Sequence, residues 1–278
     1  MNKAKKIVIL YSGGLDSFLM YHYAKIKYPE AEVKCLFFAH GQAAEKEELD
    51  SLPEFVIVRK VDWLNDTIKP IAKKDDPYAG AIYIPGRNLV FGVLAASQEL
   101  ANEVWMGTVW DEDNPKGTDK NEKFRNMTSE LLSYVLSPFL DDCKLVFPFV
   151  EEEWTKEKCV KWALTNGLTA KEIRDSSISC WHPKDGKPCG ECKQCTKRFL
   201  SFGLNGFTED YVIHPTDSEI QQKNMINYLI DFLYSEDASN RDELNMVDMM
   251  IRFFKDNDPF SEQFGILIDQ ARNKLNNQ

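Results

Sequence analysis

A strand, a glycine turn and a helix in immediate succession constrain the fold of this chain more than any other feature. Residues 7–10 form an apolar run, and residues 18–24 carry apolar side chains at helical spacing. Between them, residues 12–17 read SGGLDS. A buried strand that stops at such a turn and continues as a helix leaves several backbone N–H groups pointing at one place, where the helix dipole also favours negative charge. The sequence therefore predicts a phosphate site, whose candidate residues are Leu10, Tyr11, Ser12, Gly13, Gly14, Leu15, Asp16, Ser17 and Phe18.

Two better-known phosphate-binding turns do not fit these residues. No Gly-Lys-Ser/Thr follows the turn, which excludes the P-loop that carries a lysine. The two glycines are adjacent, so the G-x-G-x-x-G spacing of a dinucleotide fold is missing as well. The structural alternative is an ordinary strand-turn-helix without a ligand, but Ser, Asp and Ser around two glycines favour the site.

Further apolar runs predict a parallel α/β sheet. Four of them read as strands, at residues 33–38, 55–58, 104–107 and 144–148. Because helical stretches separate them, they indicate a doubly wound, mostly parallel sheet with right-handed crossovers. Ligands of such sheets bind at the carboxyl ends of the strands. His40 and Gln42 follow the second strand and Gly107 ends the fourth, so we expect all three near Ser12 as nucleotide-binding candidates.

Two loops complete the expected site. Proline and glycine end an extended run at residues 82–86, which brings Gly86, Arg87 and Asn88 to the entry of a helix over residues 89–101. An arginine there can bind phosphate in a fork geometry, although a solvated helix start is the alternative. The loop at residues 108–120 is the expected specificity region. Its Asp111 can orient a polar heterocycle or a metal ion, whereas runs of carboxylates also occur in solvated loops.

Four of the seven cysteines predict a metal site. Cys180, Cys189, Cys192 and Cys195 follow a C-x8-C-x2-C-x2-C pattern among prolines and glycines. Four thiolates complete a tetrahedral zinc site, and two-residue spacers let neighbouring cysteines point at one ion. His182 is a competing ligand, and redox chemistry is the alternative use of the cysteines. With no position left open on the metal, we expect a structural zinc that holds a loop.

Composition and charge narrow the class of protein. The chain has 278 residues, 43% of them hydrophobic, and no apolar run long enough for a membrane helix. Its N-terminus lacks the apolar core of a signal peptide, so we expect a cytoplasmic protein. The net charge of -10 opposes general nucleic-acid binding and favours a small-molecule substrate.

The last part of the chain differs from the rest. From about residue 215 onward, apolar side chains recur with the spacing of three helices. We expect these helices to pack on the rest of the chain or on a second copy in a homodimer. The predicted organisation is an α/β domain with the phosphate site at 1–175, a zinc region at 176–214 and a helical extension at 215–278.

The motifs together resemble a known family. SGGLDS matches every specified position of the SGGxDS loop of ATP pyrophosphatases, whose fold is adenine nucleotide alpha hydrolase-like. With residues 84–88 (IPGRN), 179–181 (SCW) and 189–195 (CGECKQC), it resembles the 7-cyano-7-deazaguanine synthase family, also called QueC, over about residues 5–206. The resemblance implies an ATP-dependent carbon–nitrogen ligase that adenylates a deazapurine carboxylate and uses ammonia to form an amide and then a nitrile.

The resemblance also implies roles for individual residues and cofactors. ATP and zinc are the implied cofactors, with magnesium bound near Asp16. Ser12, Asp16, Ser17 and Arg87 would be the catalytic set, because they would stabilise the departing pyrophosphate and the charge on phosphorus.

Two departures from the family pattern leave the product open. The Asp-x-Ser-Gly-Tyr-Pro-Asp-Cys-Arg stretch that usually follows the fourth strand is largely rewritten at residues 111–120, and the extension after residue 215 is longer than the family requires. The alternative nucleophile is a protein amine, as in QueC-like members of antiviral defence systems. An alternative of another class is a zinc-stabilised module that binds nucleotide without turnover.

Overall fold

A five-stranded parallel sheet organises the chain. The computed structural model describes residues 4–42, 44–68, 71–72, 82–113, 119–234 and 240–276. The sheet has the strand order β3-β2-β1-β6-β7, and every neighbouring pair is parallel. Its strands are β1 (Lys6–Leu10), β2 (Glu32–Ala39), β3 (Val56–Lys60), β6 (Glu103–Met106) and β7 (Lys144–Val146). The order reverses on either side of β1, so β1 and β6 flank the switch point where α/β sheets bind ligands.

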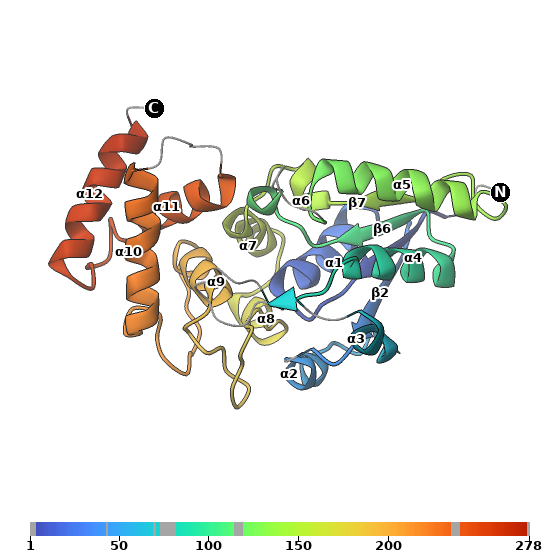
Figure 1. The fold of residues 1–278 in the computed structure, drawn as a ribbon, viewed down its shortest axis with the longest axis horizontal. Coiled ribbons are helices and arrows are strands. Elements are labelled where there is room, and N and C mark those ends of the chain that lie inside the picture. Colours follow the sequence, from blue (N-terminus) through green and yellow to red (C-terminus); the bar gives the residue numbers. More distant parts are fainter. Residues whose placement is uncertain are drawn as a thin grey trace.

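Helices cover both faces of this sheet (Figure 1). The helices of this part of the chain are α1 (Leu15–Lys27), α2 (Glu45–Asp50), α3 (Trp63–Thr67), α4 (Arg87–Glu99), α5 (Glu122–Leu136), α6 (Pro148–Glu151), α7 (Lys156–Thr165) and α8 (Ala170–Asp175), with a 3-10 turn, η1, at Trp110–Glu112. Alternate residues of β1 point to opposite faces: Ile7 and Ile9 pack with α1 and α7, and Val8 packs with α4 and α5. Both faces are buried, as the apolar runs predicted, and the predicted doubly wound α/β class is confirmed.

The zinc-motif helix and three further helices form the C-terminal part of the chain. They are α9 (Lys193–Gly203), α10 (Glu219–Tyr234), α11 (Arg241–Phe253) and α12 (Glu262–Asn276). Three helices beyond residue 215 agree with the predicted apolar spacing. Their hydrophobic cluster includes Phe199 and Leu200 from α9, so α9 belongs to the same core as the extension. The three-part division of the chain stays a prediction, and this shared core crosses its boundary at residue 214.

The extended run predicted before Pro85 is present, but the helix after it begins earlier than predicted. β5 (Ile82–Tyr83) pairs with the short strand β4 (Ile71–Ala72) in a separate two-stranded sheet. The helix that follows begins at Arg87, two residues earlier than predicted.

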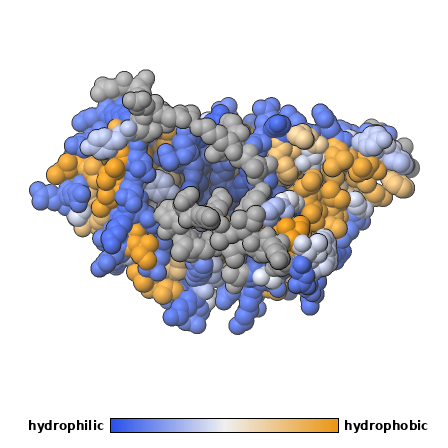
Figure 2. Space-filling model, viewed as in Figure 1, coloured by the Kyte–Doolittle hydropathy of each residue, from blue (hydrophilic) through white to orange (hydrophobic). Residues whose placement is uncertain are grey.

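The apolar side chains of α5 do not all face the core. The spacing of its apolar residues indicates a core helix, but Met127, Leu131 and Val135 are 60%, 43% and 47% exposed. The buried face consists of Thr128, Leu132 and Leu136, with Phe124 partly buried. Hydrophobic residues are correspondingly visible on the side of the molecule where α5 lies (Figure 2).

Among the described residues, no helix is both long and apolar enough to cross a membrane.

Candidate functional site

The predicted phosphate loop lies at the carboxyl end of β1 and opens into α1. Gly13 has φ +75°, a left-handed conformation that favours glycine, and a Cβ on Gly14 would lie 3.2 Å from Ser12 Oγ. The Ser17 hydroxyl ties the turn together, because it donates to the Gly14 carbonyl and accepts from the Ser12 N–H. The backbone conformation therefore favours glycine at Gly13, and a side chain at Gly14 would have to displace the Ser12 hydroxyl.

The backbone of this loop fits a phosphate group. The N–H groups of Gly13, Asp16 and Ser17 have no protein acceptor among the described residues, whereas Leu15 N–H donates to Ser179 Oγ at 2.9 Å. Free N–H groups at a helix N-terminus are the usual ligands of a bound anion. The side chains of Leu10, Tyr11, Leu15 and Phe18 lie in the hydrophobic clusters on the two faces of the sheet, so these candidates support the loop from below.

Ile178 and Ser179, which belong to the zinc region, hold the phosphate loop through two hydrogen bonds. The Ile178 N–H donates to the Gly13 carbonyl at 2.9 Å, and Ser179 holds Leu15 as described above. Because Cys180 follows directly, the chain passes from the phosphate loop contact to the cysteine cluster within one residue. Ser179 was part of the sequence motif, but its contact with Leu15 could not be foreseen from it.

Asp16 is paired with a buried lysine that the sequence analysis missed. Lys156 Nζ lies 2.9 Å from Asp16 Oδ2, and the lysine side chain is 1% exposed. Asp16 Oδ1 has no partner among the described residues. A signal for Lys156 was present, because it shares one helical face with Cys159, Val160 and Ala163, which are all buried. A charged residue on an apolar face requires a buried partner of opposite charge.

The other candidates lie at the ends of β2 and β6 and at the start of α4. Gln42 Oε1 accepts from the His40 N–H, and Gln42 Nε2 donates to Glu48 Oε2 at 2.7 Å. A Cβ on Gly107 would touch Asp16, so β6 ends directly against the loop. Gly86 adopts φ +75° before Arg87, and Asn88 Nδ2 donates to Asp119 Oδ2 at 2.9 Å.

Glu48 is a further acidic group beside the loop. Its Cβ lies 3.4 Å from the position that a Cβ on Gly13 would occupy. Burial raises the pKa of Glu48 to about 7, against the lowering effects of Gln42 and Arg87. A carboxyl with such a pKa changes its charge in the neutral range, immediately behind the proposed phosphate position.

Asp111 lies in a buried charge network rather than a solvated loop. Its Oδ2 is 3.0 Å from Lys197 Nζ and accepts from Asn245 Nδ2 at 3.2 Å, while Oδ1 has no partner among the described residues. Lys197 also lies 2.5 Å from Asp242, and Glu112 pairs with Lys120 at 2.9 Å. Residues 114–118 of the expected specificity loop lie outside the described residues.

The charges of this network hold one another ionised. Burial alone would lower the pKa of Lys197, but Asp111, Glu112 and Asp242 raise it well above its usual value. Burial alone would raise the pKa of Glu112, but Lys120 and Lys197 hold it below its usual range. Asp111 is the exception, because burial outweighs Lys197 and its pKa is raised. The network is within electrostatic range of the phosphate loop: Glu112 chiefly raises the pKa of Lys120, and Asp16 adds to this effect.

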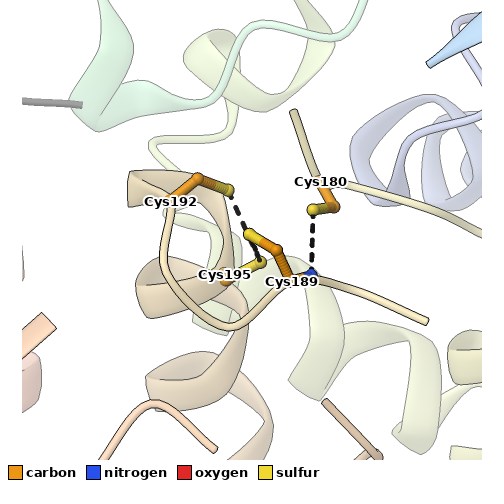
Figure 3. Close-up of side chains that lie close together, drawn as sticks. All are labelled: Cys180, Cys189, Cys192 and Cys195. Carbon is orange, nitrogen blue, oxygen red and sulfur yellow. Dashed lines mark hydrogen bonds between the residues drawn. The ribbon is translucent and has the colours of Figure 1, made fainter. Parts of the chain in front are cut away.

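The four cysteines form a single cluster, as predicted (Figure 3). Their Sγ atoms all lie within 4.8 Å of one another, which brings together the ligands of a tetrahedral zinc site. Backbone N–H groups of His182 and Cys189 point at Cys180 Sγ, and that of Gly190 points at Cys195 Sγ, as donors to thiolates do. Within the described part of the chain, His182 is not a member of the cluster. The donor set therefore fits a structural zinc.

Gly190 shows how tightly this cluster is built. It adopts φ +81°, and a Cβ there would lie 1.7 Å from the Ile213 carbonyl oxygen. No side chain fits, so the position next to Cys189 must be glycine.

A cavity of about 730 Å³ is bounded by α2, by the end of α8 and by the turn at residues 185–188, and Ile178 is the part of its lining that contacts the phosphate loop. Its lining is mixed in charge, with Lys46, Arg174 and Lys187 among several carboxylates. The volume is in the range of small-molecule sites.

Comparison with known proteins agrees with these features. The family model of the queuosine biosynthesis protein QueC matches residues 6–206. This chain belongs to the QueC family. The predicted resemblance over about residues 5–206 is thereby confirmed, and the extension beyond residue 206 lies outside the matched segment.

Three curated relatives are named 7-cyano-7-deazaguanine synthase. The protein of Pyrococcus furiosus is 28% identical over 78% of this chain and 99% of its own length. The protein of Nitratiruptor is 26% identical over 72% of this chain and 95% of its own length. The protein of Alteromonas mediterranea is 23% identical over 74% of this chain and 97% of its own length. Among solved structures, the U34-tRNA thiolase NcsA of Methanococcus maripaludis matches 74% of this chain and 83% of its own at 13% identity, with a TM-score of 0.28.

Membership of the QueC family supports a 7-cyano-7-deazaguanine synthase-like activity, for which ATP is a fitting cofactor, and the cysteine cluster fits zinc.

Proposed function

We propose that this protein is an AMP-forming ligase that activates the carboxylate of 7-carboxy-7-deazaguanine with ATP. A carboxylate oxygen attacks the α-phosphorus of ATP, and pyrophosphate leaves. Ammonia then attacks the acyl carbon of the adenylate and AMP leaves, which gives the amide. A second activation of the amide oxygen by ATP, followed by loss of AMP, gives the nitrile, 7-cyano-7-deazaguanine.

One observation carries the proposal: three backbone N–H groups, from Gly13, Asp16 and Ser17, lie at the start of α1 in a chain of the QueC family, and no acceptor for them is found in the part of the chain that the structure describes. They are suited to hold the β,γ-phosphates, because the donors are fixed before the charge on the leaving pyrophosphate develops. The hydroxyls of Ser12 and Ser17 and the guanidinium of Arg87 would add donors to the same phosphates. Bound magnesium would neutralise phosphate charge, with Asp16 Oδ1 available to a water of its shell.

The proposed site also explains why Lys156 is buried. It holds Asp16 by one oxygen and so keeps the carboxylate oriented beside the loop, while the other oxygen has no partner in the described ranges of the chain. The zinc would supply no chemistry to the reaction, because four thiolates leave no open position on it.

A turnover assay tests this function. Purified protein is mixed with ATP, magnesium and 7-carboxy-7-deazaguanine, with and without ammonia, and AMP, pyrophosphate and the organic product are followed. We expect AMP and pyrophosphate, with an amide or nitrile that depends on ammonia. Release of ADP and phosphate, or no release, contradicts the proposal. Asp16→Asn is expected to abolish turnover, whereas full activity of this variant would contradict the role given to Asp16.

A protein amine is the second candidate nucleophile. It is favoured by the extension beyond the family match, whose α11 reaches the 110–113 segment beside the proposed substrate. In the same assay, this candidate predicts that the protein consumes ATP but yields a stable product only when an acceptor protein is added. Neighbouring genes for queuosine synthesis favour ammonia, and genes of a defence system favour the protein acceptor.

A further inference from the structure

The first turn of α11 contacts the predicted specificity segment at several points. Arg241 lies over the Trp110 ring, with its Cζ 4.6 Å from the ring centroid, and its Nη1 is 3.8 Å from Asp113 Oδ2. One turn later, Asn245 Nδ2 donates to Asp111 Oδ2 at 3.2 Å. Residues of the extension thus hold the segment immediately after the carboxyl end of β6.

Asp242 secures the same segment through a buried lysine. Lys197 Nζ lies 2.5 Å from Asp242 Oδ1 and 3.0 Å from Asp111 Oδ2, and Lys193 pairs with the other oxygen of Asp242. The side chains of Lys197 and Asp111 are 2% and 0% exposed. Because so buried a pair has no water to replace a lost partner, the position of each group depends on the others.

One acceptor of this network is left unused. Asp111 Oδ1 has no donor within the described residues, although the side chain is completely buried. A buried polar atom without a partner destabilises the fold, and a ligand that supplies the donor removes this cost. Two oriented contacts on Oδ2, from Lys197 and Asn245, determine where Oδ1 points.

We propose that Asp242 and Asn245 are positioning residues for substrate specificity, which orient Asp111 so that its Oδ1 accepts an N–H group of the substrate's heterocycle. The inference rests on the proposed function, since it concerns the carboxylate substrate of that reaction. Both residues lie beyond residue 206, outside the family-matched segment. The extension would thereby form one wall of the substrate site.

Three variants of one helical turn test the inference. Asn245→Ala removes the donor to Asp111, Asp242→Asn removes the charge that holds Lys197, and Glu243→Gln removes a charge from the same turn without a contact to the network. Steady-state rates are measured while ATP and 7-carboxy-7-deazaguanine are titrated separately. We expect the KM for the carboxylate to rise about tenfold or more in the first two variants, with the KM for ATP within about twofold of wild type. Asp242→Glu, which keeps the charge, should restore part of the loss.

The outcomes separate the inference from the proposed function. An active wild type in which Asn245→Ala and Asp242→Asn match Glu243→Gln overturns the inference and leaves the function intact. An inactive wild type overturns the function, and amide hydrogen exchange then decides the positioning role. Faster exchange at residues 107–113 in the two variants supports the inference, and exchange equal to that of Glu243→Gln overturns it.

Discussion

Glu48 gives the phosphate loop a pH-dependent neighbour. Because burial raises its pKa to about 7 from an ordinary value of 4.5, the folded protein binds this proton more tightly than the unfolded chain. The associated stability is complete below about pH 4.5 and is lost as the pH rises through about 7. We expect Glu48→Gln to remove this loss and to be more stable than wild type at pH 8 by about 1–2 kcal/mol. Solvent screening of the partly exposed carboxyl keeps the gain below the full value of the pKa shift.

Urea unfolding at pH 5 and pH 8 measures the effect. The difference between Glu48→Gln and wild type should be larger at pH 8 than at pH 5, whereas Glu47→Gln on the same helix should show no such change. A constant difference across this pH range would contradict the assigned pKa.

The Asp16–Lys156 pair makes a second prediction at the scale of single residues. Lys156→Met leaves Asp16 without its cation, and breaking a buried pair in this way typically costs about 3–5 kcal/mol. We expect the free energy of unfolding to fall by about 3 kcal/mol, at the lower end of this range, because Asp16 is 18% exposed and keeps some hydration.

A double-mutant cycle isolates this pair. The variant Asp16→Asn/Lys156→Met should regain part of the stability that Lys156→Met loses, because no unpaired charge remains. Lys158→Met, an exposed lysine of the same helix, is the control. If both lysine variants unfold at the same urea concentration, the pair does not stabilise the fold.

At the scale of elements, the zinc region and the phosphate loop form one unit. Ser179 holds the Leu15 N–H and is followed by Cys180 of the cluster. Removing zinc should therefore free the residue 178–179 clamp as well as the cysteines. We expect chelation to weaken ATP binding about tenfold, which corresponds to about 1.4 kcal/mol and to the loss of one or two hydrogen bonds.

Calorimetry with ATP before chelation, after chelation and after zinc is restored tests this coupling. Ser179→Ala is the matched variant, because it breaks the clamp while the four cysteines stay. It should weaken ATP binding and retain zinc, whereas Cys192→Ser should lose zinc and stability together. Unchanged ATP affinity in chelated, folded protein would refute the coupling.

The elements differ in how far their sequence determines them. The sheet and the cysteine cluster could be predicted because buried parallel strands are apolar throughout and two-residue cysteine spacing is rarely used otherwise. The exposed face of α5 could not be predicted, since periodicity shows that Met127, Leu131 and Val135 share a region of a helix but not what covers it. Lys156 and Lys197 were missed for a related reason: their partners come from distant segments, and only the fold brings a cation to Asp16 or Asp111.

At the scale of the whole molecule, the extension docks through a close approach of two helices. Gly203 ends α9, and a Cβ there would lie 2.3 Å from Cε2 of Phe253 in α11. The missing side chain lets the two helices approach, and the shared cluster around Phe199 and Leu200 is buried as a result. The same contact holds α11 where Asp242 and Asn245 reach the network around Asp111.

Gly203→Ala should therefore push α11 away from α9 and disturb the contacts of the extension with the site. The added methyl group overpacks the contact, for which we expect a loss of about 1–3 kcal/mol. Gly92→Ala is the control, because its nearest neighbour is Thr128 Cγ2 at 4.0 Å and an alanine inside α4 should be neutral or stabilising. Phe253→Leu should restore stability to Gly203→Ala, because the smaller side chain makes room for the added methyl group.

If Gly203→Ala loses stability but keeps the KM for the carboxylate, the extension stabilises the fold without shaping the substrate site. A rise in that KM, reversed by Phe253→Leu, would instead mean that helix docking and substrate recognition depend on the same contact.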